Sequence, residues 1–212
     1  MISDSQMSAE TTILTIGHSN HTFEQFLALL RQAGVTAVAD VRSSPFSQYA
    51  PQFDKDDLKD ALRDYEIAYS FLGRELGGRP RERALFCNGV ADYEKMAKEK
   101  TFREGLDRVI EGASRHRIAL MCSERDPLDC HRCLLVARRL AERGTQIRHI
   151  LASGEIVNHF EIEERLLSLE GLVANDLFAT RQERLEVAYR ARGHKVAFAE
   201  PDKDQAASVA AE

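Results

Sequence analysis

The sequence predicts a Rossmann-like α/β fold: a mostly parallel five-stranded sheet with helices on both faces, followed by C-terminal helices. Short apolar segments rich in β-branched residues alternate with segments whose apolar residues recur at helical spacing. The connections are too short for anything but right-handed crossovers between parallel strands. The predicted strands cover residues 11–17, 35–42, 67–73, 117–122 and 146–151.

The segments between these strands predict the helices that cover the sheet. Thr22 has a side chain suited to a helix N-cap, and apolar residues recur at helical spacing from Phe23 until Gly34 ends the helix. Residues 54–66 predict a polar-faced helix, residues 92–115 predict one or two helices, and a further helix runs from about Cys130 to Arg143. The Arg- and Gly-rich residues 73–91 predict a long loop, which we interpret as a flexible lid.

The C-terminal part of the chain predicts two more helices, over residues 159–172 and 175–192. Apolar residues of this part could dock on the same domain or on a second copy in a homodimer: Leu177, Phe178, Leu185 and Tyr189. We expect a single α/β domain over 11–172, a helical extension over 173–198, and flexible tails over 1–10 and 199–212.

Length, composition and net charge limit the class of protein that the sequence can encode. The chain has 212 residues, 43% of them hydrophobic, which is ample for one core. A net charge of −5 does not favour non-specific binding to a nucleic-acid backbone, although a local basic patch stays open. A secretory signal and a long apolar run are both absent from the sequence, so we expect no membrane contact. Four cysteines without framework spacing predict reduced thiols and a cytoplasmic protein.

Chemically capable residues follow four of the predicted strands where each strand ends. They are Gly17, His18, Ser19 and Asn20; then Asp40, Arg42, Ser43 and Ser44; then LGRELGGRPRER (72–83); and then CSERDPLDCHR (122–132). The carboxyl ends of parallel strands lie at one edge of a sheet, and ligands bind at that edge. The sequence therefore predicts a functional site there.

The segment 122–132 is the most informative of these. With Asp129 as N-cap, Cys130, His131 and Arg132 would lie in the first helical turn. Free backbone N–H groups at such a turn favour an anion and lower the pKa of a thiol.

Charged residues near this segment have several open roles. Glu124 and Asp126 could bind a cation, orient a histidine or carry a proton. Asp40 and Arg42 lie on the same side of their strand, and Arg42 and Arg132 could clamp a phosphate or carboxylate. In the loop 73–91, Glu75 and Arg79 are further candidates for ligand contacts.

Three interpretations of the cysteines stay open. Cys122, Cys130 and His131, with His18, could be metal ligands, although C-x7-C-H is not an established zinc spacing. Cys122 or Cys130 could instead be a nucleophile. As a third alternative the cysteines are small buried hydrophobic residues, an interpretation strongest for Cys133, on an apolar helix stripe, and for Cys87. Among the other histidines, His149 has the position of a core histidine with its hydrogen bonds satisfied.

These motifs together resemble the bacterial and archaeal family known as domain of unknown function 488. The resemblance rests on IGHSNHTFEQFLALLRQAGVTAVADVRSSP, PQF (51–53), LGG (76–78), MCSERDPLDCHR and RHILASGEIVNH, in order over residues 13 to about 167. It implies an α/β domain with motif positions Gly17, His18, Ser19, Asp40, Arg42, Ser43, Cys122, Glu124, Cys130, His131 and Arg132. The family usually has a small hydroxyl residue where this chain has Cys133, which favours a packing role for that cysteine. The family implies no activity.

The combined prediction is an enzyme, a hydrolase or a transferase, acting on a small phosphorylated or nucleotide-like anionic ligand. The predicted catalytic residues are His18, Asp40, Cys122, Glu124, Cys130 and His131. The predicted ligand-binding residues are Gly17, Ser19, Arg42, Ser43, Glu75, Arg79 and Arg132. No cofactor is indicated and no metal ligand is assigned. The alternatives are a non-catalytic nucleotide- or nucleic-acid-binding module and a metal-dependent hydrolase with Cys and His ligands.

Overall fold

The computed structural model describes residues 11–173 and 179–200 and contains the predicted α/β sheet. Its strand order is β3-β2-β6-β1-β7-β8. The first five of these strands are parallel to one another, as predicted, and β8 (Ile156–Asn158) is an additional, antiparallel edge strand. The parallel strands are β1 (Thr12–Gly17), β2 (Ala37–Asp40), β3 (Ala68–Phe71), β6 (Ile118–Cys122) and β7 (Gln146–Ile150).

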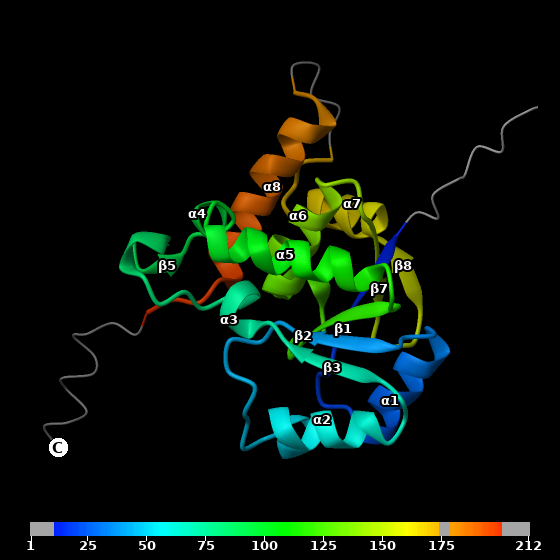
Figure 1. Cartoon of the computed structure of the whole chain (residues 1–212). Helices are drawn as coiled ribbons and strands as arrows, with labels where there is room; N and C mark the ends of the chain where they lie inside the picture. The colour runs from blue at the N-terminus through cyan, green and yellow to red at the C-terminus, as the bar shows by residue number, and fades with distance from the viewer. Residues whose placement is uncertain (1–10, 174–178, 201–212) are drawn as a thin grey trace, which may run out of the picture.

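Helices cover both faces of the sheet (Figure 1). One face packs against α1 (Phe23–Gln32), the short η1 (Pro51–Phe53) and α2 (Lys55–Arg63). The other face packs against α5 (Lys100–Ala113) and the continuous helix formed by η4 (Arg132–Ala137), a π-helical stretch, and α6 (Arg138–Ala141). In the parts of the chain described, no helix is both long and apolar enough to cross a membrane.

Alternating side chains of the strands supply both cores. In β6, Leu120 and Cys122 face the core under α5 and α6, whereas Ala119 and Met121 face α1 and α2. The central strands β1, β2 and β6 are buried on both faces and have mostly apolar sequences, which is why the sequence predicted them correctly. This alternation also decides that the Cys122 thiol lies on the α6 side of the sheet.

The predicted start of α1 is confirmed. Thr22 and Gln25 form a capping box, in which the Thr22 hydroxyl accepts from the Gln25 backbone N–H and the Gln25 side chain accepts from the Thr22 N–H. Phe26 and Leu30 are buried beneath this helix.

Residues 73–91 are not the continuous loop that the sequence predicted. They contain α3 (Gly73–Leu76), η2 (Arg83–Leu85) and a hairpin of β4 (Phe86–Cys87) and β5 (Val90–Ala91), after which α4 (Tyr93–Met96) begins. The hairpin turns at Asn88 and Gly89, with φ of 50° and 77°. Positive φ at both central positions is the geometry that an Asn-Gly pair favours, so the hairpin signal was present but its strands are only two residues long.

The predicted N-cap at Asp129 is wrong. Asp126 caps the short η3 (Pro127–Asp129), since its side chain accepts from the Leu128 backbone N–H. Cys130 is then extended, and its carbonyl accepts from the backbone N–H groups of Cys133 and Leu134, which starts the following helix. Asp129 instead pairs with Arg192. The helical turn therefore begins one residue later than predicted.

Two C-terminal helices, α7 (His159–Leu169) and α8 (Arg181–Val196), pack on the same domain. The predicted start of the second helix at residue 175, together with Leu177 and Phe178, lies outside the described residues, whereas Leu185 and Tyr189 are buried against η4 and α7. At the start of the predicted C-terminal tail, Ala199 bridges to Val90 and the Glu200 N–H donates to the Gly89 carbonyl.

A buried chain of hydrogen bonds joins β1, β7, α7 and α8. The Thr15 hydroxyl is 2.8 Å from His149 Nδ1, and His149 Nε2 is 2.9 Å from His159 Nδ1. His159 Nε2 is 3.1 Å from the Tyr189 hydroxyl, which donates to Glu163. All donors can point from Thr15 toward Glu163 when both imidazoles are neutral, so every ring nitrogen has a partner. The prediction that His149 is a satisfied core histidine is confirmed.

Because of the two buried histidines in these hydrogen bonds, we expect the protein to become less stable as the pH falls. Burial lowers the pKa of both His149 and His159 below the ordinary value of 6.5. Because the unfolded chain then binds protons first, the stabilising contribution is present above about pH 6.5 and is lost as the pH falls below it. We expect His149→Gln to cost about 1–3 kcal/mol at neutral pH. Between about pH 7 and pH 5, the free energy of unfolding measured with urea should fall less for this variant than for the wild type. Equal losses in both proteins would contradict this.

Candidate functional site

Two thiols, an imidazole and a carboxylate gather at the carboxyl end of β6. We call Cys122, Glu124, Cys130 and His131 the cysteine cluster; one ligand atom from each lies within 4.8 Å of all the others. Cys122 Sγ and Cys130 Sγ are 3.7 and 3.9 Å from His131 Nδ1. Cys130 Sγ is 2.9 Å from Glu124 Oε2. Residues from β6, from the loop after it and from the start of the next helix therefore meet at one point.

The ring of His131 is held by the backbone of the neighbouring strand. His131 Nε2 is 2.8 Å from the carbonyl oxygen of Val41, directly after β2. A carbonyl can only accept, so Nε2 bears a proton, and in the neutral form of the ring Nδ1 is the bare nitrogen. That nitrogen faces both sulfur atoms, where it can accept a thiol proton or bind a metal ion.

The surroundings separate the pKa values of the two thiols. Burial and the adjacent Cys130 raise the pKa of Cys122. Burial acts against ionisation of Cys130 too, but the thiol of Cys122 and the charges of Arg132 and His131 lower its pKa. The Arg132 backbone N–H also donates to Cys130 Sγ at 3.4 Å. Cys130 is therefore the sulfur that ionises first.

The other two members of the cluster have raised pKa values. Burial and the neighbouring Cys130 raise the pKa of Glu124. Burial opposes the charged form of His131, but Cys130, Glu124 and the Val41 carbonyl outweigh it and raise the pKa of the imidazole. Both groups are thus set up to hold a proton beside the sulfur atoms.

A cavity of about 140 Å³ opens beside the cysteine cluster. Its lining comes from the ends of β2 and β6, the segment after α3 and the C-terminal residues: Arg42, Ser43, Ser44, Gly78, Arg79, Tyr93, Cys122, Ser123, Glu124, Asp129, His131, Val196 and Phe198. We call it the small cavity. Cys122 and His131 line it although they are only 2% and 8% exposed, and Cys130 is not among the lining residues.

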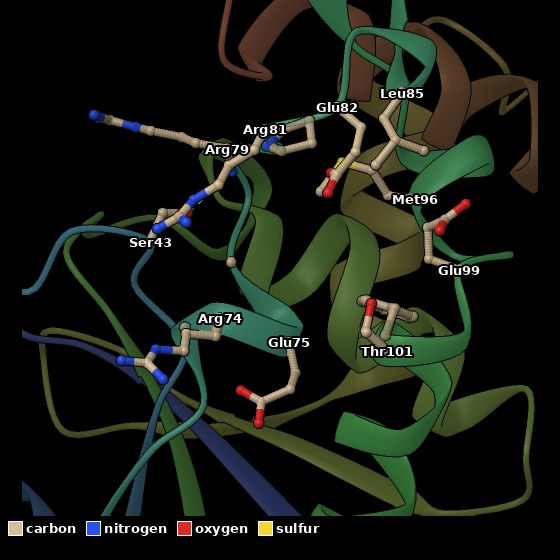
Figure 2. Close-up of a pocket in the computed structure, with 14 residues that line it drawn as sticks. Ser43, Arg74, Glu75, Arg79, Arg81, Glu82, Leu85, Met96, Glu99 and Thr101 are labelled. Atoms are coloured by element: carbon tan, nitrogen blue, oxygen red, sulfur yellow. Dashed lines mark hydrogen bonds between the residues drawn. The ribbon is translucent and has the colours of Figure 1, made fainter.

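A second cavity of about 300 Å³ adjoins the first, since Ser43 and Arg79 line both. Figure 2 shows Arg79 beside Ser43 at one side of this large cavity and Glu99 and Thr101 at the other. The Arg79 backbone N–H donates to the Ser43 hydroxyl at 3.0 Å. The predicted ligand-binding residue Glu75 lines the large cavity and is paired with Arg108.

Asp40 and Arg42 form the predicted same-side pair, and the pair is buried. The Arg42 guanidinium donates from Nη2 to Asp40 Oδ2 at 2.6 Å and from Nε to Oδ1 at 2.9 Å, and Nη2 also donates to the Phe53 carbonyl. The Tyr69 hydroxyl donates to the same carboxylate at 2.7 Å. Asp40 is fully buried and lines neither cavity, so its part in the site is to hold Arg42.

His18 does not line the small cavity but contacts Ser123, which does. Its Nδ1 donates to the Ser19 carbonyl, so its Nε2 is the acceptor, and it accepts from the Ser123 hydroxyl at 3.1 Å and from Arg42 Nη1 at 3.4 Å. Burial and the charge of Arg42 lower the pKa of His18 to about 4. The imidazole, stacked on Phe53, is therefore neutral and only weakly basic, and it orients the hydroxyl of Ser123, which lines the cavity.

Arg132 and Gly17 shape the backbone next to the site and do not line either cavity. The Arg132 side chain is fully buried and donates to the carbonyls of Glu124 and Arg125, so it shapes the loop and lines neither cavity. A Cβ on Gly17 would be 1.9 Å from the Glu124 carbonyl oxygen, so only glycine allows this close approach. Ser19 has a φ of 50° and donates to Asn20, away from both cavities.

Cys133 belongs to a different environment. It is fully buried with Leu134 and Leu166 in the core beneath α7, as its packing interpretation predicted. Its sulfur lies near His149 and His159, but the nitrogens of both rings already have hydrogen-bond partners. This group is therefore part of the core and offers no free ligand nitrogen.

Several lining residues were not predicted as site residues. Ser123 and Ser44 lie directly beside predicted ones and follow the same strands, so their positions could have been found. Tyr93, Val196 and Phe198 come from distant parts of the chain, and no local pattern marks them. Arg79 stacks on the ring of Phe198 at 5.1 Å, which brings the C-terminal segment to the cavity wall.

The fold and the site define an α/β protein with a polar cavity beside two buried thiols at the carboxyl edge of its parallel strands. The family model described as "Domain of unknown function DUF488" matches residues 22–139, more than half of the chain. The chain therefore belongs to this family, as the motif resemblance predicted. No curated protein and no solved structure matches the chain.

Gly78 provides a test of how closely the site is packed. A Cβ there would be 2.7 Å from His131 Cγ, so we expect Gly78→Ala to displace the ring and cost about 1–3 kcal/mol. Reaction of Cys122 with a thiol reagent should also become faster. Gly193→Ala in α8 is the control, since its Cβ would meet only two carbons of the Tyr93 ring, the nearer at 3.3 Å. If the two variants have the same free energy of unfolding and the same rate of thiol labelling, the site is not closely packed at Gly78.

Proposed function

We propose that this protein is an enzyme, a hydrolase or transferase, that acts on a small phosphorylated or nucleotide-like ligand in the small cavity. One observation supports this above all: groups that can react or move protons and groups that can bind an anion line the same cavity at the sheet edge.

The reactive side of the cavity consists of Cys122, Glu124 and His131. The bare Nδ1 of His131 accepts protons, and the Glu124 carboxylate passes them between the sulfur atoms and a bound ligand. Ser123 and His18 form a second proton route into the same space. Burying the two thiols and the imidazole of Cys122, Cys130 and His131 costs free energy of desolvation, which a passive binding module would not need to spend.

The anion-binding side consists of Arg79 with the hydroxyls of Ser43 and Ser44. Among the described residues no carboxylate pairs with Arg79, so its charge is available to a phosphate. Arg42 also lines the cavity, but Asp40 neutralises its charge, and its Nε and Nη2 hydrogens are used by Asp40 and the Phe53 carbonyl. The rest of the ligand would extend into the large cavity, where Leu85, Met96 and Phe102 offer apolar contacts beside Arg74 and Arg81.

Two substitutions test this proposal on a panel of phosphomonoesters and nucleotides. With any ligand that is turned over, His131→Gln should lower kcat by about 100-fold or more, because it removes the basic Nδ1. Arg79→Ala should raise KM by about tenfold, the effect of one lost charge-assisted hydrogen bond.

Arg83→Ala is the matched control, because Arg83 is an exposed arginine of the same segment that lines neither cavity. Equal effects of the two arginine substitutions would contradict the assignment of the anion site. Ligand-induced thermal stabilisation without any product would contradict catalysis and favour the binding-module alternative.

A further inference from the structure

The geometry points to a metal site within the cysteine cluster: we propose that Cys122, Cys130 and His131 bind one zinc ion whose fourth position opens to the small cavity beside Glu124. This inference rests on the proposed function's site and deepens it, because it names the group that would activate water there. With the ion bound, His131 Nδ1 would be a ligand, and Glu124 would be the group that moves protons.

Both sulfur–nitrogen distances among the three ligand atoms agree with one tetrahedral ion, and the two sulfur atoms lie within 4.8 Å of each other. Zinc binds sulfur at about 2.3 Å and imidazole nitrogen at about 2.0–2.1 Å, so a tetrahedron places sulfur and nitrogen ligands about 3.6 Å apart. The two observed distances from His131 Nδ1, to Cys122 Sγ and to Cys130 Sγ, are 3.7 and 3.9 Å. An ion at their centre would need little movement of any of the three side chains.

The donor set also selects the ion. Two thiolates and one imidazole are ligands that zinc prefers over magnesium or calcium. Histidine ligands usually donate their second nitrogen to a carbonyl or carboxylate, and His131 Nε2 already donates to the Val41 carbonyl. The Arg132 backbone N–H donates to Cys130 Sγ, as N–H groups do to metal-bound thiolates. The ligand side chains are thus oriented before any ion arrives.

Glu124 fits a different role in the same site. Its Oε2 lies 2.9 Å from Cys130 Sγ, shorter than the sulfur–oxygen separation of about 3.5 Å expected for two ligands of one tetrahedral ion. Glu124 also lines the cavity, whereas Cys130 does not. We therefore place Glu124 beside a water molecule that completes the coordination, rather than on the ion itself.

This arrangement allows a balanced hydrolytic step. The ion would lower the pKa of a water molecule in its fourth position. Glu124 would take one proton from that water as the water oxygen bonds to the phosphorus of the ligand, and would return the proton to the leaving oxygen as its bond to phosphorus breaks. Arg79 and the two serines of the cavity would hold the remaining phosphate oxygens.

The remaining two cysteines supply internal controls. Cys87 is exposed in β4, and Cys133 is buried in the core below α7. Neither belongs to the cysteine cluster. Cys87→Ser shows whether removing an exposed thiol changes the metal content. Cys133→Ala shows whether removing a buried thiol outside the cluster, but close to it in sequence, changes the metal content.

The experiment measures metal content on the full chain, purified with reductant and without a metal-affinity tag. Elemental analysis should find about one zinc per chain, removable by a chelator and restored by added Zn²⁺. Cobalt added to the metal-free protein should give a thiolate-to-cobalt charge-transfer band with the absorption of a four-coordinate ion. Cys122→Ser, Cys130→Ser and His131→Gln should each lose the metal, whereas Cys87→Ser, Cys133→Ala and Glu124→Gln should retain it.

Two results would overturn the inference. One is a reduced, folded wild-type protein that takes up neither Zn²⁺ nor Co²⁺; the wild-type titration stays decisive even where a variant fails to fold. The other is metal loss in Glu124→Gln equal to that in Cys122→Ser, which would make the site closed rather than open. Failure of the proposed function is separate: protein that holds zinc and turns nothing over contradicts catalysis, while active metal-free protein contradicts only the metal site.

Discussion

The hydrogen bond from His131 to the Val41 carbonyl is the interaction on which the site depends. It joins the start of the η4 helix to the end of β2, 90 residues earlier in the sequence. Because it consumes the Nε2 proton, it decides which nitrogen faces the two sulfur atoms. Gly78 lies against the other side of the ring, where any larger residue would displace it. The chemistry of the cysteine cluster is therefore a consequence of how the sheet and the helix meet.

Other charged groups near the site are used to build it rather than to react. The buried pair of Asp40 and Arg42 is tolerated because Tyr69 and the Phe53 carbonyl complete its hydrogen bonds. A buried pair that loses one partner costs about 3–5 kcal/mol, so the two residues stabilise the cavity wall only as a pair. Arg132 similarly holds the backbone at residues 124 and 125, close to Gly17.

The sequence predicted the fold well where the pattern depended on burial. Strands covered on both faces have continuous apolar sequences, and Thr22 with Gln25 forms a capping box that local chemistry alone decides. The errors lie where tertiary contacts outweighed local signals. The edge strand β8 is three residues long, and the Asn88–Gly89 hairpin joins strands of two residues. Asp129 lost the predicted N-cap role because Asp126 capped an earlier turn.

The position of the site could be predicted from the sequence, but the arrangement within it could not. The carboxyl-edge rule brings together residues that follow β1, β2 and β6. The separation of Cys122 and Cys130 in sequence conceals that both sulfurs lie near one nitrogen, since an extended Cys130 turns its side chain back toward the strand. Phe198, from beyond α8, lines the cavity without any local pattern to indicate it.

The most direct test of this account is a crystal structure of the protein purified under reducing conditions, with diffraction measured on both sides of the zinc absorption edge. One anomalous peak should lie about 2.3 Å from the sulfur atoms of Cys122 and Cys130 and about 2.0 Å from His131 Nδ1. Glu124 should lie outside bonding distance of this peak, and the peak should face the small cavity. Absence of a peak, with the Nδ1 of His131 bonded only to a thiol, would contradict it.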